Sequence, residues 1–336
     1  MSDGRKSVGD VIIEKFIEAV DKEGKMPWQM PYNRYLAFNW YSMTQYHGIN
    51  RLILPLGEYL SMNQMITYNK KHGTNYRYDK TVGPWWSVVF FKTDIKSASD
   101  SEMEKLAGTK SEEDFIKKYP HGVFSGGWLY YINTSTGCFM KKRNILRYTN
   151  VAERSCFIDD EGRALPSRYE TGDVQITKYK PKDIFDRYVK KEGISIKFDR
   201  GEIPCYIPKL DLIVLNPLAK SEDFYWSYAF HEASHSTGVK NRLNREFFKY
   251  IGENGVDRGV LDDLRSKEEC IAEISSSMLC SECDIVDFNT SECDVYKNNL
   301  AYVESWKRRI KDWGNSFIYI VSEAEKAYQY IMGESN

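Results

Sequence analysis

The stretch that most constrains the fold runs from Phe224 to Gly238 and reads FYWSYAFHEASHSTG. It contains an H-E-x-x-H pattern that begins at His231 and ends at His235. Residues four apart on an α-helix lie on one face, so both imidazoles can reach one metal ion. Glu232 follows the first histidine and is placed to handle the proton of a water molecule at that metal. The pattern therefore predicts a zinc site with two histidine ligands and Glu232 as the catalytic carboxylate.

The residues around the motif favour a helix. Ser221 is a suitable N-cap, and the acidic Glu222 and Asp223 suit the first turn, because negative charge is stabilised at a helix N-terminus. Gly238 is a suitable C′ residue to end the helix. Two histidines on an ordinary amphipathic helix are the alternative interpretation, which we disfavour because the helix signals and the motif coincide.

A site of this kind needs a third protein ligand, and residues 266–280, SKEECIAEISSSMLC, form a second helical pattern. Glu269 and Glu273 are four apart and share a face of that helix. We predict Glu269 as the third ligand, and Glu273 as a carboxylate that hydrogen-bonds a ligating histidine. Ser266 and Glu269 also have capping-box spacing, which would engage Glu269 at the helix start, so the choice between the two glutamates stays open. The other three histidines lie far upstream and are weaker candidates: His47, His72 and His121.

Composition is typical of a soluble globular protein with two domains, since 42% of the 336 residues are hydrophobic and 28% are charged. No apolar run approaches the length of a membrane span, and the N-terminus lacks a signal-peptide core, so we expect a cytoplasmic protein with no membrane partner. The seven cysteines have no regular spacing and are expected to be free thiols. A second zinc site at Cys280-x-x-Cys283, with Cys270 and Cys293 nearby, is the alternative.

Charge is unevenly distributed, although the formal net charge of the whole chain is only −1. Residues 1–150 hold 21 Lys and Arg against 15 Asp and Glu, and five of the eight Trp. Single-stranded nucleic acid suits such a composition, because phosphates need cations and bases stack on flat aromatic side chains. An aromatic core beneath a charged surface would have the same composition, so composition alone leaves DNA binding open.

Hydrophobic periodicity and turn signals predict an α+β fold. In the first half, a helix follows the capping pair Ser7 and Asp10 and ends at Gly24, and a second helix spans 61–71. A strand is expected over 85–92, where the sequence is WWSVVFFK. The second half is expected to hold further helices at 181–192, 294–313 and 316–332, and strands at 194–198, 204–208 and 212–217.

The order of these blocks resembles that of ArdC-type antirestriction proteins. The resemblance begins with the opening helix, the Pro-Trp-x-x-Pro loop at 27–31, the Tyr-x-Gly-Ile-Asn at 46–50, and the Asn-Gln pair at 63–64. It continues through the H-E-x-x-H, the S-T-G-x-x-x-R-L-N-R extension at 236–245, and the E-E-x-x-A-E at 268–273. Two departures are that Ser236 stands where the family commonly has Trp, and that the helix with the Asn-Gln pair lacks the usual Trp.

The resemblance implies a single-stranded-DNA-binding domain over residues 1–150, with an insertion at about 93–125. It further implies a linker over 151–175 and a zincin-like, gluzincin-like metallopeptidase domain over 176–336 with one Zn²⁺ per chain. Candidate DNA-contacting residues on the matched blocks are Trp28, Tyr46, Asn50, Arg51, Asn63, Gln64 and Lys92.

The function expected from motif and resemblance is zinc-dependent peptide hydrolysis, joined to single-stranded DNA binding in an antirestriction role. The expected partners are single-stranded DNA and a protein or peptide substrate that the sequence does not identify. A non-catalytic DNA-protecting protein with a structural or vestigial metal is the alternative, and a metallonuclease or other hydrolase is a third. Three further residues have ordinary alternatives: Tyr206 assists an oxyanion or packs in the core, and Arg242 and Arg245 orient substrate or form salt bridges.

Overall fold

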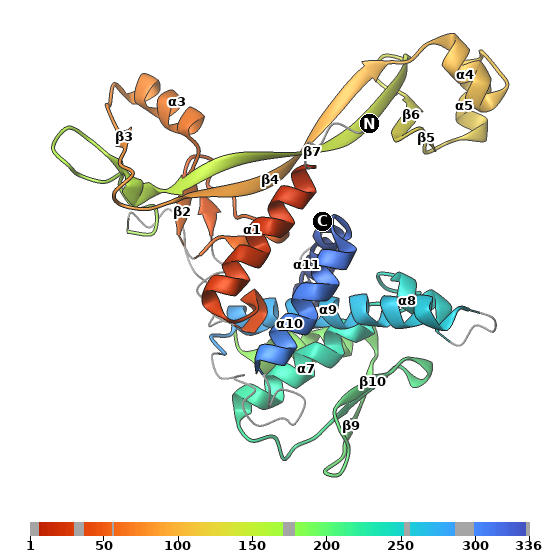
Figure 1. Ribbon diagram of the computed structural model, residues 1–336. Helices are drawn as coiled ribbons and strands as arrows, with labels where there is room; N and C mark the ends of the chain where they lie inside the picture. Colours follow the sequence, from red (N-terminus) through yellow and green to blue (C-terminus); the bar gives the residue numbers. More distant parts are fainter. Residues whose placement is uncertain are drawn as a thin grey trace. The chain divides into compact units, whose positions relative to one another are not determined.

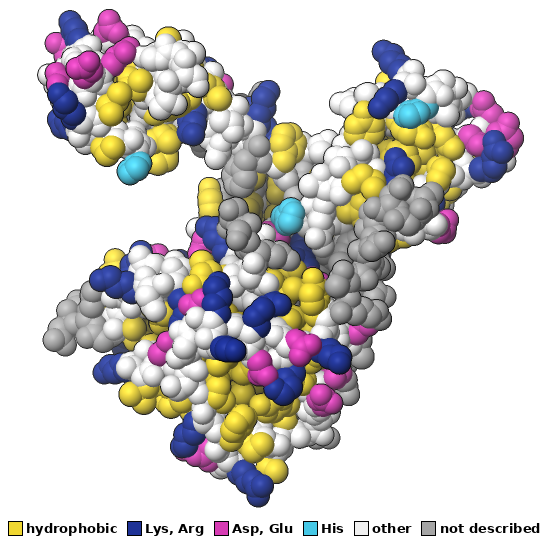
Figure 2. All heavy atoms as spheres, turned by 180° about the vertical axis from the view of Figure 1, so that it is seen from behind, with side chains coloured by type: hydrophobic (Ala, Val, Ile, Leu, Met, Phe, Trp, Pro, Cys, Tyr) yellow, Lys and Arg dark blue, Asp and Glu magenta, His cyan; other side chains and the backbone are white. Residues whose placement is uncertain are grey.

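The computed structural model describes residues 7–29, 37–55, 57–170, 179–251, 256–285 and 299–333. Helices and strands are mixed along the chain, which confirms the predicted α+β class (Figure 1). The chain divides into two compact units, one made of residues 1–88 together with 150–336, and the other of residues 89–149. Lys and Arg side chains are interspersed with Asp and Glu over the face seen in Figure 2. Within the described ranges, no helix is long and apolar enough to cross a membrane.

The first part of the larger unit is built from short strands and capped helices. Helix α1 starts after a capping box between Ser7 and Asp10 and ends at Gly24, whose φ of 65° is left-handed, as predicted. Helix α3 has the same design, with Ser61 and Gln64 as its capping box. The elements are α1 (Val8–Glu23), η1 (Pro27–Gln29), β1 (Phe38–Asn39), α2 (Ile49–Ile53), β2 (Glu58–Leu60), α3 (Met62–His72), β3 (Arg77–Tyr78), the start of β4 (Trp85–Ser97), η2 (Arg154–Cys156) and β8 (Phe157–Ile158). Strand β4 continues into the smaller unit from residue 89.

Strand β1 pairs in parallel with β2, and β2 pairs antiparallel with the end of β7 (Phe139–Glu153). Strand β3 pairs antiparallel with β8. Part of the segment predicted as a linker over 151–175 is packed, because Cys156, Phe157 and Leu165 are buried against Trp40 and Leu60. The rest of that segment, from residue 171, lies outside the described residues.

The second part of the larger unit follows the predicted order, a small sheet and then helices. The sheet has the order β10-β11-β9, with β10 antiparallel and β9 parallel to β11. Helix α9 packs against both α7 and α11 (Figure 1). The elements are α6 (Pro181–Glu192), β9 (Ser195–Phe198), β10 (Cys205–Ile207), η3 (Pro208–Leu210), β11 (Leu212–Leu215), α7 (Glu222–Ser236), α8 (Glu246–Tyr250), α9 (Arg258–Glu282), α10 (Asn299–Trp313) and α11 (Ser316–Met332).

Segments assigned to different domains from the sequence share one core in this unit. Trp28 is buried, donates to the Tyr302 hydroxyl over 3.2 Å, and packs edge-on against Trp306. Arg51 is also buried, pairs with Glu282 at 3.1 Å, and lies over the Tyr328 ring. These contacts join the N-terminal segment to the C-terminal helices within one unit. The domain boundaries expected near residues 150 and 175 stay predictions.

The smaller unit, residues 89–149, is a sheet covered by two helices. Its strands are ordered β5 (Val123–Ser125), β6 (Trp128–Ile132) and β7. Helices α4 (Asp100–Ala107) and α5 (Glu112–Lys118) are N-capped by Ser99 and Ser111. They bury apolar side chains against one face of the sheet; the core comprises Met103, Ala107, Phe115, Tyr130 and Phe139.

Candidate metal centre

Helix α7 presents the H-E-x-x-H motif. Ser221 caps the helix as predicted, because its hydroxyl accepts the N–H of Phe224 over 3.2 Å. The rings of His231 and His235 meet on one face, with their Nε2 atoms 3.1 Å apart. Gly238 follows the helix end, but it is not among the glycines with positive φ. Its role is close packing, since a Cβ there would lie 2.2 Å from the Phe248 ring.

Helix α9 supplies the carboxylates. It starts at Arg258, with Asp257 as its N-cap, about two turns earlier than the sequence pattern suggested. Ser266 is therefore inside the helix, where its hydroxyl donates to the Asp262 carbonyl oxygen over 2.8 Å. The capping-box alternative for Glu269 is wrong for this reason, and the Glu269 side chain extends towards α7 instead.

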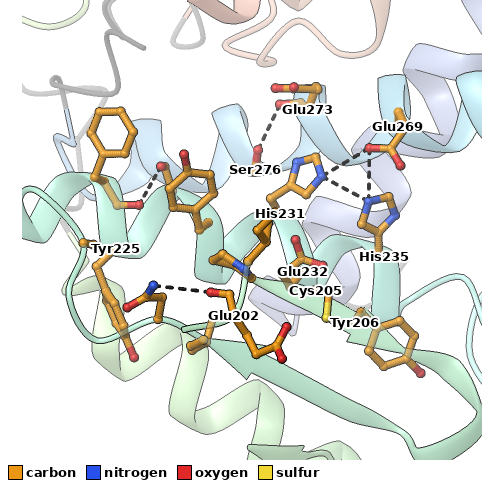
Figure 3. Close-up of a pocket in the computed structure, with 18 of the residues that line it drawn as sticks. Glu202, Cys205, Tyr206, Tyr225, His231, Glu232, His235, Glu269, Glu273 and Ser276 are labelled. Carbon is orange, nitrogen blue, oxygen red and sulfur yellow. Dashed lines mark hydrogen bonds and ion pairs between the residues drawn. The ribbon is translucent and has the colours of Figure 1, made fainter. Parts of the chain in front are cut away.

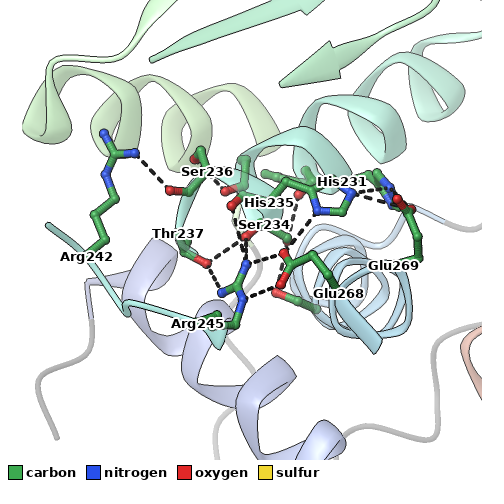
Figure 4. A network of polar contacts seen from close by, with 12 residues as sticks. His231, Ser234, His235, Ser236, Thr237, Arg242, Arg245, Glu268 and Glu269 are labelled. Atoms are coloured by element: carbon green, nitrogen blue, oxygen red, sulfur yellow. Dashed lines mark hydrogen bonds and ion pairs between the residues drawn. The ribbon is translucent and has the colours of Figure 1, made fainter. Parts of the chain in front are cut away.

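The structure brings His231, His235 and Glu269 together (Figures 3 and 4). The Glu269 Oε2 atom lies 3.5 Å from the Nε2 atom of each histidine, and the two nitrogens are 3.1 Å apart. Zinc bonds to nitrogen and oxygen are about 2.0–2.1 Å long, so tetrahedral ligand atoms should be about 3.3 Å from one another. The three atoms thus already have the spacing that a tetrahedral divalent metal requires.

Glu232 lies beside this group on α7 and is 6% exposed. It lines a cavity of about 880 Å³ together with the two histidines and Glu269. Strand β10 contributes Cys205 to the cavity wall, close to Glu232 (Figure 3). Burial and the nearby Glu232 charge raise the pKa of the Cys205 thiol. The cavity is therefore large enough for a chain segment, and its acidic group sits next to the candidate ligands.

Glu268, which the spacing argument missed, is the carboxylate that supports His235. It is 2% exposed, and its Oε1 atom lies 3.1 Å from the His235 Nδ1 atom. The sequence pattern predicts Glu273 in this role. Glu273 lines the cavity, and its hydrogen bond to a ligating histidine stays a prediction. Burial alone would lower the pKa of His231, but the Glu269 hydrogen bond raises it, with smaller contributions from the charges of Glu232 and Glu273. Only the adjacency of Glu268 to Glu269 in the sequence hinted at the role of Glu268, because helical periodicity places the two on different faces.

The electrostatics of the cluster favour charged, paired groups. Burial alone would lower the pKa of His235, but its contacts with Glu268 and Glu269 raise it to about 10. Burial would likewise raise the pKa of Glu269, yet its hydrogen bonds to both histidines hold the pKa well below its usual range. A metal ion that binds here therefore has to displace protons from the histidines.

Comparison with known proteins agrees with this architecture. Residues 183–320 match the family model of a zincin-like metallopeptidase. The crystal structure of the antirestriction protein ArdC from the R388 plasmid, in its metal-free form, superposes with a TM-score of 0.60 at 23% identity over 98% of both chains. The chain has the ArdC fold. The Mn(II)-bound structure of that ArdC gives a TM-score of 0.55 at 20% identity, also over 98% of both chains.

Curated relatives extend the likeness to a larger protein. The chain is 25% identical to the DNA primase TraC of Escherichia coli over 340 residues, which cover 98% of this chain but 20% of TraC. It is 23% identical over 153 residues to the uncharacterized protein y4eC of Sinorhizobium fredii (strain NBRC 101917 / NGR234), 45% of each. This chain thus spans about a fifth of the TraC relative. The resemblance to ArdC-type proteins is confirmed for the fold over nearly the whole chain.

The two arginines after the metal helix form salt bridges, which confirms the alternative interpretation of both. The Arg242 side chain is fully buried and pairs with Asp211 at 2.6 Å and Glu192 at 3.0 Å. Arg245 pairs with Glu268 at 2.6 Å. The Tyr206 hydroxyl donates a hydrogen bond to Asp211 over 2.7 Å. In this structure the hydroxyl is therefore directed to Asp211 and not to the candidate metal ligands.

The candidate DNA-contacting residues differ in their exposure to solvent. Trp28 and Arg51 are buried as described above, and Asn50 is buried beside Arg51 in α2. Tyr46 and Gln64 both hydrogen-bond the side chain of Asn39, at 3.1 and 3.2 Å.

Two of the candidates are exposed. Asn63 lies on α3 in the larger unit, whereas Lys92 lies on β4 in the smaller unit. The structure therefore brings Tyr46 and Gln64 together, and the complete set spans both compact units.

Proposed function

We propose that this chain is a zinc-dependent metallopeptidase with the ArdC fold, in which His231, His235 and Glu269 hold one Zn²⁺. The observation that carries the proposal is the triangle of ligand atoms, with edges of 3.1, 3.5 and 3.5 Å, inside the cavity that Glu232 lines. Two imidazoles and one carboxylate are the donor set of zinc peptidases of the H-E-x-x-H type. The Mn(II)-bound ArdC relative supports a metal site in this fold.

The chemistry follows from the residues around the cavity. When bound, the metal supplies Lewis acidity, which polarises the scissile carbonyl and lowers the pKa of a water molecule. Glu232 accepts a proton from the attacking water and donates it to the leaving amine. Strand β10 borders the same cavity and gives an extended substrate a strand edge along which to align.

The variant Glu232→Gln tests this proposal. The amide keeps the size of the side chain but cannot accept the proton, so peptide hydrolysis should fall by about 10²–10⁴-fold while zinc content stays near one per chain. We would follow cleavage of a fluorogenic peptide library by the full-length protein and measure zinc by elemental analysis. Cleavage retained in Glu232→Gln would exclude the mechanism. A zinc-loaded wild-type protein that cleaves nothing, yet protects DNA, would favour the non-catalytic alternative.

We further propose that the smaller unit binds single-stranded DNA on its uncovered sheet face. Tyr130 packs under α4 and α5, so its strand neighbours point to the opposite face. There, Phe124 and Lys142 are both paired with Leu129, and Phe124 is 77% exposed. The Lys142 ammonium lies 5.2 Å from the centre of the Tyr131 ring. Exposed rings beside a cation suit stacked bases and phosphates.

Charge in this unit differs between strands and helices. Of the strand cations, Lys142 lies on the uncovered face, whereas Lys141 is registered with Tyr130 and pairs with Glu102 of α4. Strands β4 and β7 carry six basic residues of the unit, whereas six of its seven acidic residues lie in α4 and α5. The substitutions Phe124→Ala and Lys142→Ala should each weaken binding of a labelled oligothymidylate, by about tenfold for the stacking residue, as measured by fluorescence anisotropy. Ile116→Ala, an exposed apolar residue on α5, is the matched control. Wild-type affinity in both strand variants would rule this face out.

Together these two activities suit an antirestriction role, which is the role of the ArdC relative, and we place this role in the cytoplasm. DNA binding would bring the chain to incoming DNA, and the peptidase would act on a protein there. Protection of DNA that persists in Glu232→Gln would show that binding alone suffices.

A further inference from the structure

The loop after the metal helix turns back beneath the end of α7. The Leu243 N–H donates to the Thr237 carbonyl oxygen, and the Arg245 N–H donates to that of Gly238, both over 2.8 Å. Asn244 has a left-handed φ of 52°, which allows the tight reversal. A Cβ on Gly238 would lie 2.7 Å from an Arg245 guanidinium nitrogen. The missing side chain at position 238 therefore leaves room for Arg245 under the helix.

The Arg245 guanidinium joins three parts of the site (Figure 4). It donates to both carboxylate oxygens of Glu268, over 2.6 and 2.8 Å. It also donates to the Thr237 hydroxyl over 2.6 Å and to the Ser234 carbonyl oxygen over 2.8 Å. The side chains of Arg245 and Glu268 are only 3% and 2% exposed. A bidentate pair of this kind fixes the plane of the carboxylate as well as its position.

The fixed carboxylate in turn orients His235. Glu268 Oε1 lies 3.1 Å from His235 Nδ1, and a carboxylate at this position accepts the N–H of Nδ1. With the proton on Nδ1, the Nε2 lone pair is directed to the side where His231 and Glu269 lie. The Arg245 guanidinium is 3.4 Å from the His235 carbonyl oxygen as well, so it contacts both the backbone and the ring support of this residue.

We propose that Arg245 and Glu268 are positioning residues that set the ring orientation and tautomer of His235 for metal binding. This inference rests on the proposed metal centre, but it concerns metal affinity and geometry rather than peptide hydrolysis. Supporting carboxylates of this type contribute about 10–100-fold to metal affinity in zinc sites.

The test compares Glu268→Gln, Arg245→Lys and the double variant in the full-length protein. Zn²⁺ affinity is measured by competition with a chromophoric chelator, and ligand geometry by the visible absorption of the Co²⁺-loaded protein. We expect about 10–100-fold weaker Zn²⁺ binding and an altered Co²⁺ spectrum for Glu268→Gln, and a smaller loss for Arg245→Lys. The double variant should lose little more than Glu268→Gln alone, because Arg245 acts through Glu268.

Arg242→Lys is the matched control, because Arg242 lies on the same loop with a buried, doubly paired guanidinium that contacts neither ligand nor Glu268 in the described contacts. It should lower the melting temperature about as much as Arg245→Lys but leave Zn²⁺ affinity unchanged. Wild-type Zn²⁺ affinity and a wild-type Co²⁺ spectrum in folded Glu268→Gln would overturn the inference. Because Glu268→Gln is nearly isosteric, it still tests the inference if Arg245→Lys fails to fold. Wild-type metal binding in His231→Ala/His235→Ala would instead overturn the metal centre itself.

Discussion

Behind His235, Arg245 and Glu268 form a buried pair, whereas in residues 89–149 Lys142 and Arg143 lie near the surface over aromatic rings. Arg245 and Glu268 are almost wholly excluded from water. In the smaller unit, Arg143 is 41% exposed, lies 4.3 Å from the centre of the Trp128 ring and forms a long ion pair with Asp94 at 3.5 Å. Lys142 is exposed and lies over Tyr131.

The difference separates two uses of charge. Two charges that are buried together are stable only as a closely hydrogen-bonded pair, so the pair holds one geometry. Removal of one partner leaves the other charge buried without compensation. An exposed cation over an aromatic ring contributes little to stability and stays available to a phosphate. The first arrangement suits a site that must be rigid before a metal arrives, and the second suits a surface that binds a flexible polymer.

The largest expected effect comes from removing one partner of the buried pair. Arg245→Met leaves the Glu268 carboxylate buried without its bidentate donor, so the free energy of unfolding should fall by about 3–5 kcal/mol. Urea unfolding of the metal-free protein measures this. Lys141→Met, which breaks the pair with Glu102 at 2.6 Å in the smaller unit, should change stability far less. Equal losses in the two variants would erase the contrast between the units.

Removal of metal should give an intermediate effect with a clear pH dependence. The pKa of His235 is raised to about 10, above the ordinary value near 6.5 that the unfolded chain would have. Its contribution to the stability of the metal-free protein is therefore complete below about pH 6.5 and is lost as the pH rises through about 10. Metal competes with the same proton, so Zn²⁺ affinity should rise with pH over that window, by about tenfold per unit for each proton released.

Thermal unfolding with chelator and with Zn²⁺, at pH 6.5, 7.5 and 8.5, measures both trends. The metal-free melting temperature should decline while the Zn²⁺-induced increase grows. His235→Ala should weaken both trends without abolishing them, because the Glu269 hydrogen bond also raises the pKa of His231. A Zn²⁺-induced increase that is independent of pH would mean that the histidines are already neutral in the metal-free protein.

Local signals in the sequence predicted much of what positions the motif. Ser7 and Ser221 were recognisable as N-caps, because a capping hydroxyl and the N–H group that it accepts lie within four residues of each other in the sequence. The face shared by His231 and His235 followed from helical spacing for the same reason.

Contacts between elements were not predictable in this way. Glu268 meets His235 only because α9 packs across α7, and no spacing rule records the crossing of two helices. The burial of Trp28 beside Tyr302 likewise depends on a long-range contact between the two ends of the chain. The resemblance made Trp28 a candidate for DNA contact, and its side chain is buried in the packed core.

The smallest expected effect belongs to the smaller unit. The hydrogen bond from Lys141, with help from the Ser99 N–H, lowers the pKa of Glu102 to about 2. A carboxyl group whose pKa is depressed on folding stabilises the protein above its unfolded value, near 4.5, and that contribution is lost as the pH falls through about 2. The pair is partly open to solvent, so screening reduces the contribution. Glu102→Gln should therefore flatten a shallow decline in melting temperature between pH 4.5 and 2.5, and added salt should weaken the decline in the wild type. A steep decline that survives both changes would place the acid-sensitive groups in the buried cluster around Glu268 rather than in this unit.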